Sequence, residues 1–162
     1  MYAKRSVSTR IAKYLFVVII FMGIISSLSL LVMASNKSDA EAINISGSLR
    51  IQSYRLLTEM ERSPNTVEQN LVRYQDSLNA NVLLTVQNQF FAPSGMKASY
   101  QKILQRWSVM SDFARAHQIE KYHAELKSYV QDVDDFVLEL QRFAEQKWIS
   151  AVSVLCISML LI

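Results

Sequence analysis

The sequence is poor in residues that break helices, cross-link chains or bind metals. Its 162 residues include three glycines, two prolines, two histidines and one cysteine. A single cysteine excludes an intrachain disulfide, and the scarcity of glycine and proline favours long helices. His117 and His123 have no cysteine or paired carboxylate at metal-ligand spacing, so we expect both at the surface. Without a glycine-rich phosphate loop or a Gly-x-Ser-x-Gly motif, we expect no catalytic residue, no metal site and no cofactor.

Positive charge is concentrated at the N-terminus. The formal net charge is +3, and four residues already contribute +4 before residue 15: Lys4, Arg5, Arg10 and Lys13. From Ser35 to Lys147, 13 Lys and Arg face 14 Asp and Glu, a net charge of −1. A basic face for nucleic acid therefore has no support. The tail instead fits the rule that positive residues stay on the cytoplasmic side of a membrane, so we expect a cytoplasmic N-terminus.

Two apolar runs flank the middle of the chain. Leu15 to Ala34 is an uncharged run of 20 residues, which is close to the length that spans a bilayer. A cleaved signal peptide is the alternative, because Val32-Met-Ala34 resembles a cleavage site, but signal h-regions are only about 7–15 residues long. We therefore expect a retained anchor. The second run, Trp148 to Ile162, has 15 residues and no closing flank, so we expect a fragment that stops inside its second membrane helix.

The segment between these runs lacks strand-like alternation and predicts four helices. Ser63-Pro-Asn65 and Ala92-Pro-Ser-Gly95 should end the first two helices, and the third should end near His117 to Glu120. Apolar residues keep helical spacing through the last three: Val67, Leu71, Tyr74, Leu78, Val82 and Thr85 or Val86; Tyr100, Ile103, Leu104, Trp107, Met110, Phe113 and Ala114; Tyr122, Leu126, Tyr129, Val130, Val133, Phe136, Val137, Leu140, Phe143 and Ala144. Short links between such helices predict an all-α, antiparallel up-down four-helix bundle.

The most informative stretch runs from Asp39 to Leu56 and contains one glycine and no proline. Gln52 is the only polar member of its stripe, which otherwise contains Ala42, Ile45, Leu49 and Leu56. Gly47, Arg50 and Tyr54 share a second face of the same helix. A glycine inside a helix costs about 1 kcal/mol relative to alanine, and a close backbone or a small ligand is the usual compensation. The arginine one turn further on makes an anion a natural ligand.

Two segments carry a family resemblance. Asp39–Leu56 closely resembles the signature at the start of the sensor domain in bacterial nitrate/nitrite-sensing histidine kinases, and Asp135–Lys147 is similar to the last sensor helix of that family. The resemblance implies a homodimer whose first helices face each other, with one nitrate or nitrite ion on the two-fold axis. It implies that Arg50 of each chain binds the anion. We expect Gly47 to be part of the anion site as well, because it has no side chain to block the pocket.

Neighbouring residues are given supporting or structural roles. We expect Ser46 and Tyr54 to support the anion site, because small residues such as Ser46 let another helix come close. Arg55 faces elsewhere and is expected in a structural ion pair. Three aspartates point around different sides of a helix and are interpreted as a solvated face rather than a cation site: Asp132, Asp134 and Asp135.

The apolar runs, the basic tail and the resemblance together predict how the chain is organised in the bacterial inner membrane. We expect a basic cytoplasmic N-terminus (1–14), a first transmembrane helix (15–34), a periplasmic four-helix-bundle sensor domain (35–147) and the start of a second transmembrane helix (148–162). The bundle should be continuous with both membrane helices, the second of them truncated. Helix displacement would pass across the membrane to a histidine kinase, absent from this fragment, and from it to a response regulator.

Two other functions fit the same architecture. One is a chemoreceptor-type four-helix sensor for another small ligand, with a methyl-accepting output instead of a kinase. The other is a membrane-anchored scaffold bundle without a ligand. An enzyme is the least supported reading of this fragment, because no nucleophile or base pair is visible.

Overall fold

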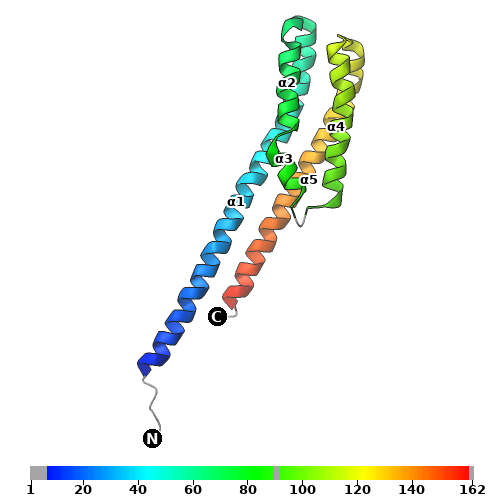
Figure 1. Ribbon diagram of the computed structural model, residues 1–162. Coiled ribbons are helices and arrows are strands. Elements are labelled where there is room, and N and C mark those ends of the chain that lie inside the picture. Colours follow the sequence, from blue (N-terminus) through cyan, green and yellow to red (C-terminus); the bar gives the residue numbers. More distant parts are fainter. Residues whose placement is uncertain (1–6, 90–91, 161–162) are drawn as a thin grey trace. The chain divides into compact units, whose positions relative to one another are not determined.

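The computed structural model describes residues 7–89 and 92–160, and every regular element in them is helical. These elements are α1 (Val7–Arg62), a 3₁₀ turn η1 (Pro64–Thr66), α2 (Val67–Leu78), α3 (Asn81–Gln87), α4 (Ser94–Arg115) and α5 (Ile119–Leu160) (Figure 1). The chain forms two compact units. One contains Met1–Asn36 and Trp148–Ile162, and the other, called the main unit below, contains Lys37–Lys147.

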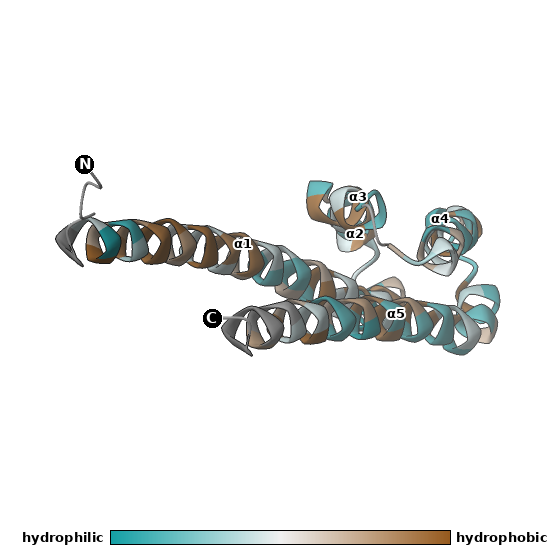
Figure 2. Ribbon diagram, turned by 90° about the horizontal axis from the view of Figure 1, so that it is seen from below, coloured by the Kyte–Doolittle hydropathy of each residue, from teal (hydrophilic) through white to brown (hydrophobic). Residues whose placement is uncertain are grey.

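The first apolar run is part of α1. Among the described residues, α1 is the one helix long and apolar enough to cross a membrane. Its N-terminal part is predominantly apolar, as the brown colour in Figure 2 shows, and large side chains such as Leu15 and Phe16 are exposed there. A core helix of a soluble protein would bury such residues. Part of the second run lies in α5, where Trp148 and Ile149 are also exposed, while Leu161 and Ile162 lie outside the described residues.

Buried residues recur at alternating spacings of three and four along the helices of the main unit. In α1 they are Asp39, Ala42, Ser46, Leu49, Ser53, Leu56 and Met60; in α2, Val67, Leu71, Tyr74 and Leu78. In α4 they are Met96, Tyr100, Ile103, Trp107, Met110 and Ala114; in α5, Tyr122, Leu126, Tyr129, Val133, Phe136, Leu140 and Phe143. This is the spacing of helices that pack side by side at small angles.

Neighbouring helices of the main unit are antiparallel, because contacts pair rising residue numbers in one helix with falling numbers in the other. Between α1 and α5, Asp39 meets Lys147 and Arg50 meets Asp134. Contacts between α1 and α2 follow the same order, Glu59 with Asn70 and Ser53 with Tyr74. So do those between α2 and α4, Glu68 with Arg115 and Leu78 with Tyr100. Between α4 and α5 the pairs are Ser99 with Glu139 and Arg106 with Glu125. The arrangement is compatible with the expected up-down four-helix bundle.

The expectation of one uninterrupted second helix is wrong. The helix stops at Leu78, and Ala80 has an extended ψ of 129° before α3 begins. Leu78 and Leu83 are both fully buried, although residues five apart on an unbroken helix point about 140° away from each other. The break turns both toward the core. The hydroxyl of Tyr100 donates to the Leu78 carbonyl at 2.5 Å, which satisfies an acceptor at the helix end.

The turn between α4 and α5 lies where the sequence predicts it. His117 has a left-handed φ of 53°, a region that histidine tolerates better than most residues. The N–H of Gln118 donates to the Phe113 carbonyl and that of His117 to the Ala114 carbonyl, the pattern of a Schellman cap. His117 and His123 are exposed, as predicted.

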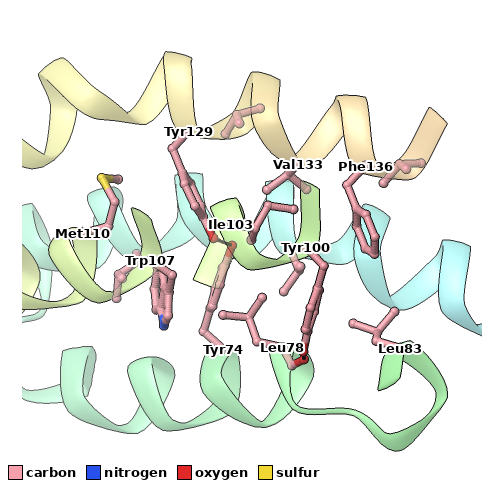
Figure 3. Close-up of a cluster of buried hydrophobic side chains, with 14 of the residues drawn as sticks. Tyr74, Leu78, Leu83, Tyr100, Ile103, Trp107, Met110, Tyr129, Val133 and Phe136 are labelled. Carbon is pink, nitrogen blue, oxygen red and sulfur yellow. Dashed lines mark hydrogen bonds between the residues drawn. The ribbon is translucent and has the colours of Figure 1, made fainter. Parts of the chain in front are cut away.

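Hydroxyl groups connect the helices inside the core. Tyr74 from α2 and Tyr129 from α5 point toward each other, and their hydroxyl oxygens lie 2.8 Å apart (Figure 3). Ser53 of α1 joins them, because its Oγ lies 3.2 Å from the Tyr74 hydroxyl. Tyr122 donates to the Ser53 carbonyl, and Trp107 of α4 stacks on Tyr74. Burial raises the pKa of each of these tyrosines, so their hydroxyls remain protonated donors.

Candidate anion-binding face

Three of the four predicted site residues share one outer face of α1. Arg50 and Tyr54 are exposed, and Gly47 is half-buried beside them. Ser46 is fully buried instead, because it occupies the spacing that points into the core of its own subunit. The structure therefore groups Gly47, Arg50 and Tyr54 and separates Ser46 from them.

The Arg50 guanidinium bridges α1 and α5. Its Nη1 donates to Oδ1 of Asp134 at 2.8 Å, and its Nε donates to the Gly47 carbonyl at 3.5 Å. The Arg50 and Asp134 side chains are 46% and 37% exposed, so solvent reaches the pair. Arg55 instead lies 3.7 Å from Glu59, one turn further along α1, which confirms its expected structural ion pair.

Asp134 is the residue that sequence reasoning missed at this face. The sequence predicts a solvated position for it, which agrees with its 37% exposed side chain, but only the pairing of α1 with α5 brings it to Arg50. For Asp132 the expectation of a solvated position is wrong, because it is only 9% exposed. An antiparallel register of α1 against α5 would have located Asp134, and that of α4 against α5 would have located Asp132.

Gly47 leaves open space over α1. A Cβ built on it would meet Nη2 of Arg50 at 3.9 Å, which is an ordinary van der Waals contact. Contacts within this chain therefore do not require a glycine at this position. The cost of a glycine inside a helix, about 1 kcal/mol, is not offset by a close approach inside the subunit.

A second series with heptad spacing follows this open side of α1. It contains Ala40, Asn44, Gly47, Ile51, Tyr54 and Thr58, and we call it the outer stripe. Ile51 is 72% exposed and Tyr54 is also exposed, although both are large and apolar in character. Small residues at one end and apolar ones at the other are suited to packing against another helix.

A contrasting cation–anion network joins α4 to α5. Asp132 accepts from Lys102 at 2.7 Å and from Arg106 at 2.5 Å. Burial disfavours the charged form of Asp132, but hydrogen bonds and charges from the two cations outweigh it and lower the pKa of that carboxyl. Arg106 also donates to Glu125 and Ser128. Both Nη atoms of Arg106 are therefore engaged within the chain itself.

Comparison with known proteins identifies the family. Residues 31–129 match the PilJ family, described as type IV pili methyl-accepting chemotaxis transducer N-term. The whole chain is 64% identical to the sensor protein NarQ homolog of Haemophilus influenzae, covering 29% of that protein. Over 154 residues, or 95% of the chain, it is 33% identical to the nitrate/nitrite sensor protein NarQ of Escherichia coli, covering 27% of it. The chain thus spans less than a third of the length of these curated relatives.

The resemblance first drawn from Asp39–Leu56 and Asp135–Lys147 is therefore confirmed. More than half of the chain lies within one family match, and both curated relatives are sensor proteins. The chain belongs to the PilJ-type sensor N-terminal family, and its curated homologues are NarQ sensors.

Proposed function

We propose that this chain is the sensor portion of a membrane receptor for nitrate or nitrite. One anion binds on the two-fold axis of a homodimer, between the Arg50 side chains of the two subunits. The observation that carries the proposal is an exposed guanidinium beside an open glycine on the outer stripe of α1. The printed names of the relatives support the choice of anion.

The outer stripe supplies a surface for the dimer. Ile51 and Tyr54 would gain burial against the same residues of a second copy, and each fully buried large side chain contributes about 1.5–3 kcal/mol. Gly47 would let the two α1 backbones approach, which removes the cost noted above. A two-fold axis along this stripe would bring the two Arg50 residues near each other, because an isologous interface repeats each contact.

The electrostatics favour a shared monovalent anion. Two guanidiniums about 8 Å apart repel by roughly 2 kcal/mol at an effective dielectric constant of 20, whereas an anion midway gains about 4 kcal/mol from each. The gross balance is about −6 kcal/mol before desolvation and hydrogen bonding. Micromolar binding needs about −8 kcal/mol, so charge-assisted bonds from two arginines reach it and a single arginine falls short.

Because Asp134 holds Arg50, anion binding requires Arg50 to exchange the carboxylate of Asp134 for the anion. A carboxylate held about 6 Å from the anion would repel it by roughly 3 kcal/mol at the same dielectric, and two of them would cancel most of the gain. Arg50 must therefore leave Asp134 to bind nitrate. The exposed pair is easily broken, because such ion pairs contribute only about 0–1 kcal/mol.

The route of signalling is inferred from the parts of the chain that α1 and α5 connect. Each helix includes part of the main unit and part of an apolar run, so we propose that a displacement of α1 relative to α5 crosses the inner membrane. The main unit lies in the periplasm and the N-terminus in the cytoplasm. The output is a histidine kinase and its response regulator. A chemoreceptor-type output is the second candidate, because the matching family model is described as a chemotaxis transducer.

Calorimetry on the full chain, reconstituted in nanodiscs in chloride-free buffer, tests the proposal. We expect heat on titration with nitrate or nitrite, weaker heat with chloride, and one anion per two chains. Arg50→Ala should abolish the heat, whereas the matched control Arg55→Ala should retain it. A folded dimer that gives no heat with any of these anions would overturn the proposal and favour a scaffold.

A further inference from the structure

A second ion pair between α1 and α5 lies at the other end of their contact. The Nζ of Lys147 is 2.6 Å from Oδ1 and 2.5 Å from Oδ2 of Asp39. The Asp39 side chain is 4% exposed and that of Lys147 is 20% exposed, so the pair is largely shielded from solvent. Nζ also donates to Oε1 of Gln89 at 2.8 Å and lies 4.5 Å from the ring centroid of Phe143. Three segments of the chain therefore meet at one ammonium group.

The position of this pair within the main unit is informative. Asp39 is two residues from the start of the main unit and Lys147 is its last residue. The pair thus joins α1 to α5 where both helices leave the main unit. Gln89 follows α3 and fixes the ammonium from a third direction. A change in the register of α1 against α5 at this level has to break or rebuild these contacts.

Burial makes this pair harder to break than the pair at Arg50. Separating buried partners leaves an uncompensated charge in a poorly hydrated place, whereas water replaces the partner in an exposed pair. The Asp39 carboxylate occupies a core spacing of α1, so separation would leave it buried without its partner. The two pairs along the α1–α5 contact therefore differ in how firmly they hold.

We propose that Asp39, Lys147 and Gln89 form a latch that holds α1 and α5 in the resting register of the receptor. The latch rests on the proposed function, because it opposes the displacement that anion binding favours. Removing the latch then moves the equilibrium toward the displaced register. By thermodynamic linkage, the same change tightens anion binding, since the anion no longer works against the latch.

Titration of nitrate into full-chain variants in nanodiscs tests the linkage. We expect Asp39→Asn with Lys147→Gln, which removes both charges together, to bind nitrate about fivefold more tightly. The charge exchange Asp39→Lys with Lys147→Asp should bring affinity back toward the original value. Lys102→Met breaks an ion pair between α4 and α5 and serves as the matched control, with unchanged affinity expected. Unchanged or weaker nitrate binding in the folded neutral pair would overturn the latch.

A distance measurement decides the question without nitrate. Spin labels at exposed Glu41 and Arg142, in a Cys156→Ser background, report the register of α1 against α5. We expect a narrow distance distribution in the original chain and a shifted or broadened one in the neutral pair. The same distribution in both would disprove the latch. If the original chain binds no nitrate, the anion-sensing proposal fails alone and the distances still decide the latch.

Discussion

Arg50 and Arg106 form similar contacts, but the two contacts differ in burial and therefore in how strongly they hold. Each reaches from one helix to an aspartate on α5, Arg50 from α1 to Asp134 and Arg106 from α4 to Asp132. The two aspartates are only two residues apart, but about 200° of helical rotation separates them, so they serve opposite neighbours. Arg106 is 23% exposed and its aspartate 9%, about half and a quarter of the values at the other pair.

The difference teaches that burial, more than residue type, decides what an arginine–aspartate pair does here. Exposed pairs contribute about 0–1 kcal/mol, whereas breaking a buried pair costs about 3–5 kcal/mol. Arg106 therefore contributes mainly to the stability of its own chain. Arg50 could leave its aspartate with little loss of stability, as the proposed anion site requires.

Arg106→Met should produce the largest effect. We expect the free energy of unfolding to fall by about 2 kcal/mol, less than for a fully buried pair because Arg106 is partly exposed. Nitrate affinity should not change. Denaturant unfolding of the full chain in detergent, followed by circular dichroism, measures the loss. Arg50→Met is the matched control and should cost under about 1 kcal/mol; similar losses in both would remove the distinction drawn above.

Gly47→Leu tests whether anion binding at the exposed Arg50 needs the open space at residue 47. In the proposed dimer, leucine would fill the space between the two arginines, so we expect nitrate affinity to fall at least about tenfold, or 1.4 kcal/mol. Helix content should be unchanged, because the new Cβ meets only the end of a flexible side chain. Gly95→Leu, at the start of α4, is the matched control in the same calorimetric titration. Full affinity in the Gly47 variant would mean that the glycine is merely tolerated.

Acid should weaken the buried pair in a defined pH range. The pKa of Asp132 is lowered in the folded chain, so its contribution to stability is complete above the unfolded value near 3.9 and is lost as the pH falls toward the lowered value. The stability deficit of Asp132→Asn should therefore be largest at neutral pH and should shrink as the pH falls below about 4. Urea unfolding at several pH values measures this. A constant deficit would contradict the assignment.

Asp134→Asn should produce the smallest effect. Removing the competing carboxylate frees Arg50, so nitrate should bind about threefold more tightly, within the contribution of an exposed ion pair. Asp135→Asn is the control, because its carboxylate accepts from Gln131 on the outside of α5. Weaker binding in the Asp134 variant would mean that this aspartate orients the guanidinium for the anion instead of competing with it.

Much of the fold could be predicted from local signals. The two proline-containing segments predicted the C-terminal end of the first helix and the start of α4. The apolar spacing in α4 and α5 identified their core faces. The break after Leu78 could not be predicted, because no glycine or proline marks it and packing against Tyr100 accounts for it. Ser46 and Ser53 were missed as core positions because hydroxyls do not register in an apolar pattern.

The predicted site likewise divides into residues that helix geometry places and one residue that tertiary packing places. Gly47, Arg50 and Tyr54 share a face because helix geometry alone dictates it. Asp134 required knowledge of which α5 residue lies opposite Arg50, which depends on tertiary register. Residues 84 positions apart give no local signal of contact.

Helix α1 carries two seams, the core series from Asp39 to Met60 and the outer stripe from Ala40 to Thr58. Turning α1 about its own axis would move both series away from the sides that they face, because both lie on the same helix. A short shift along the axis leaves each series facing the same side, although it breaks contacts such as the Asp39–Lys147 pair. In the proposed dimer, α1 is therefore suited to carry a signal lengthwise and resists carrying it as a twist.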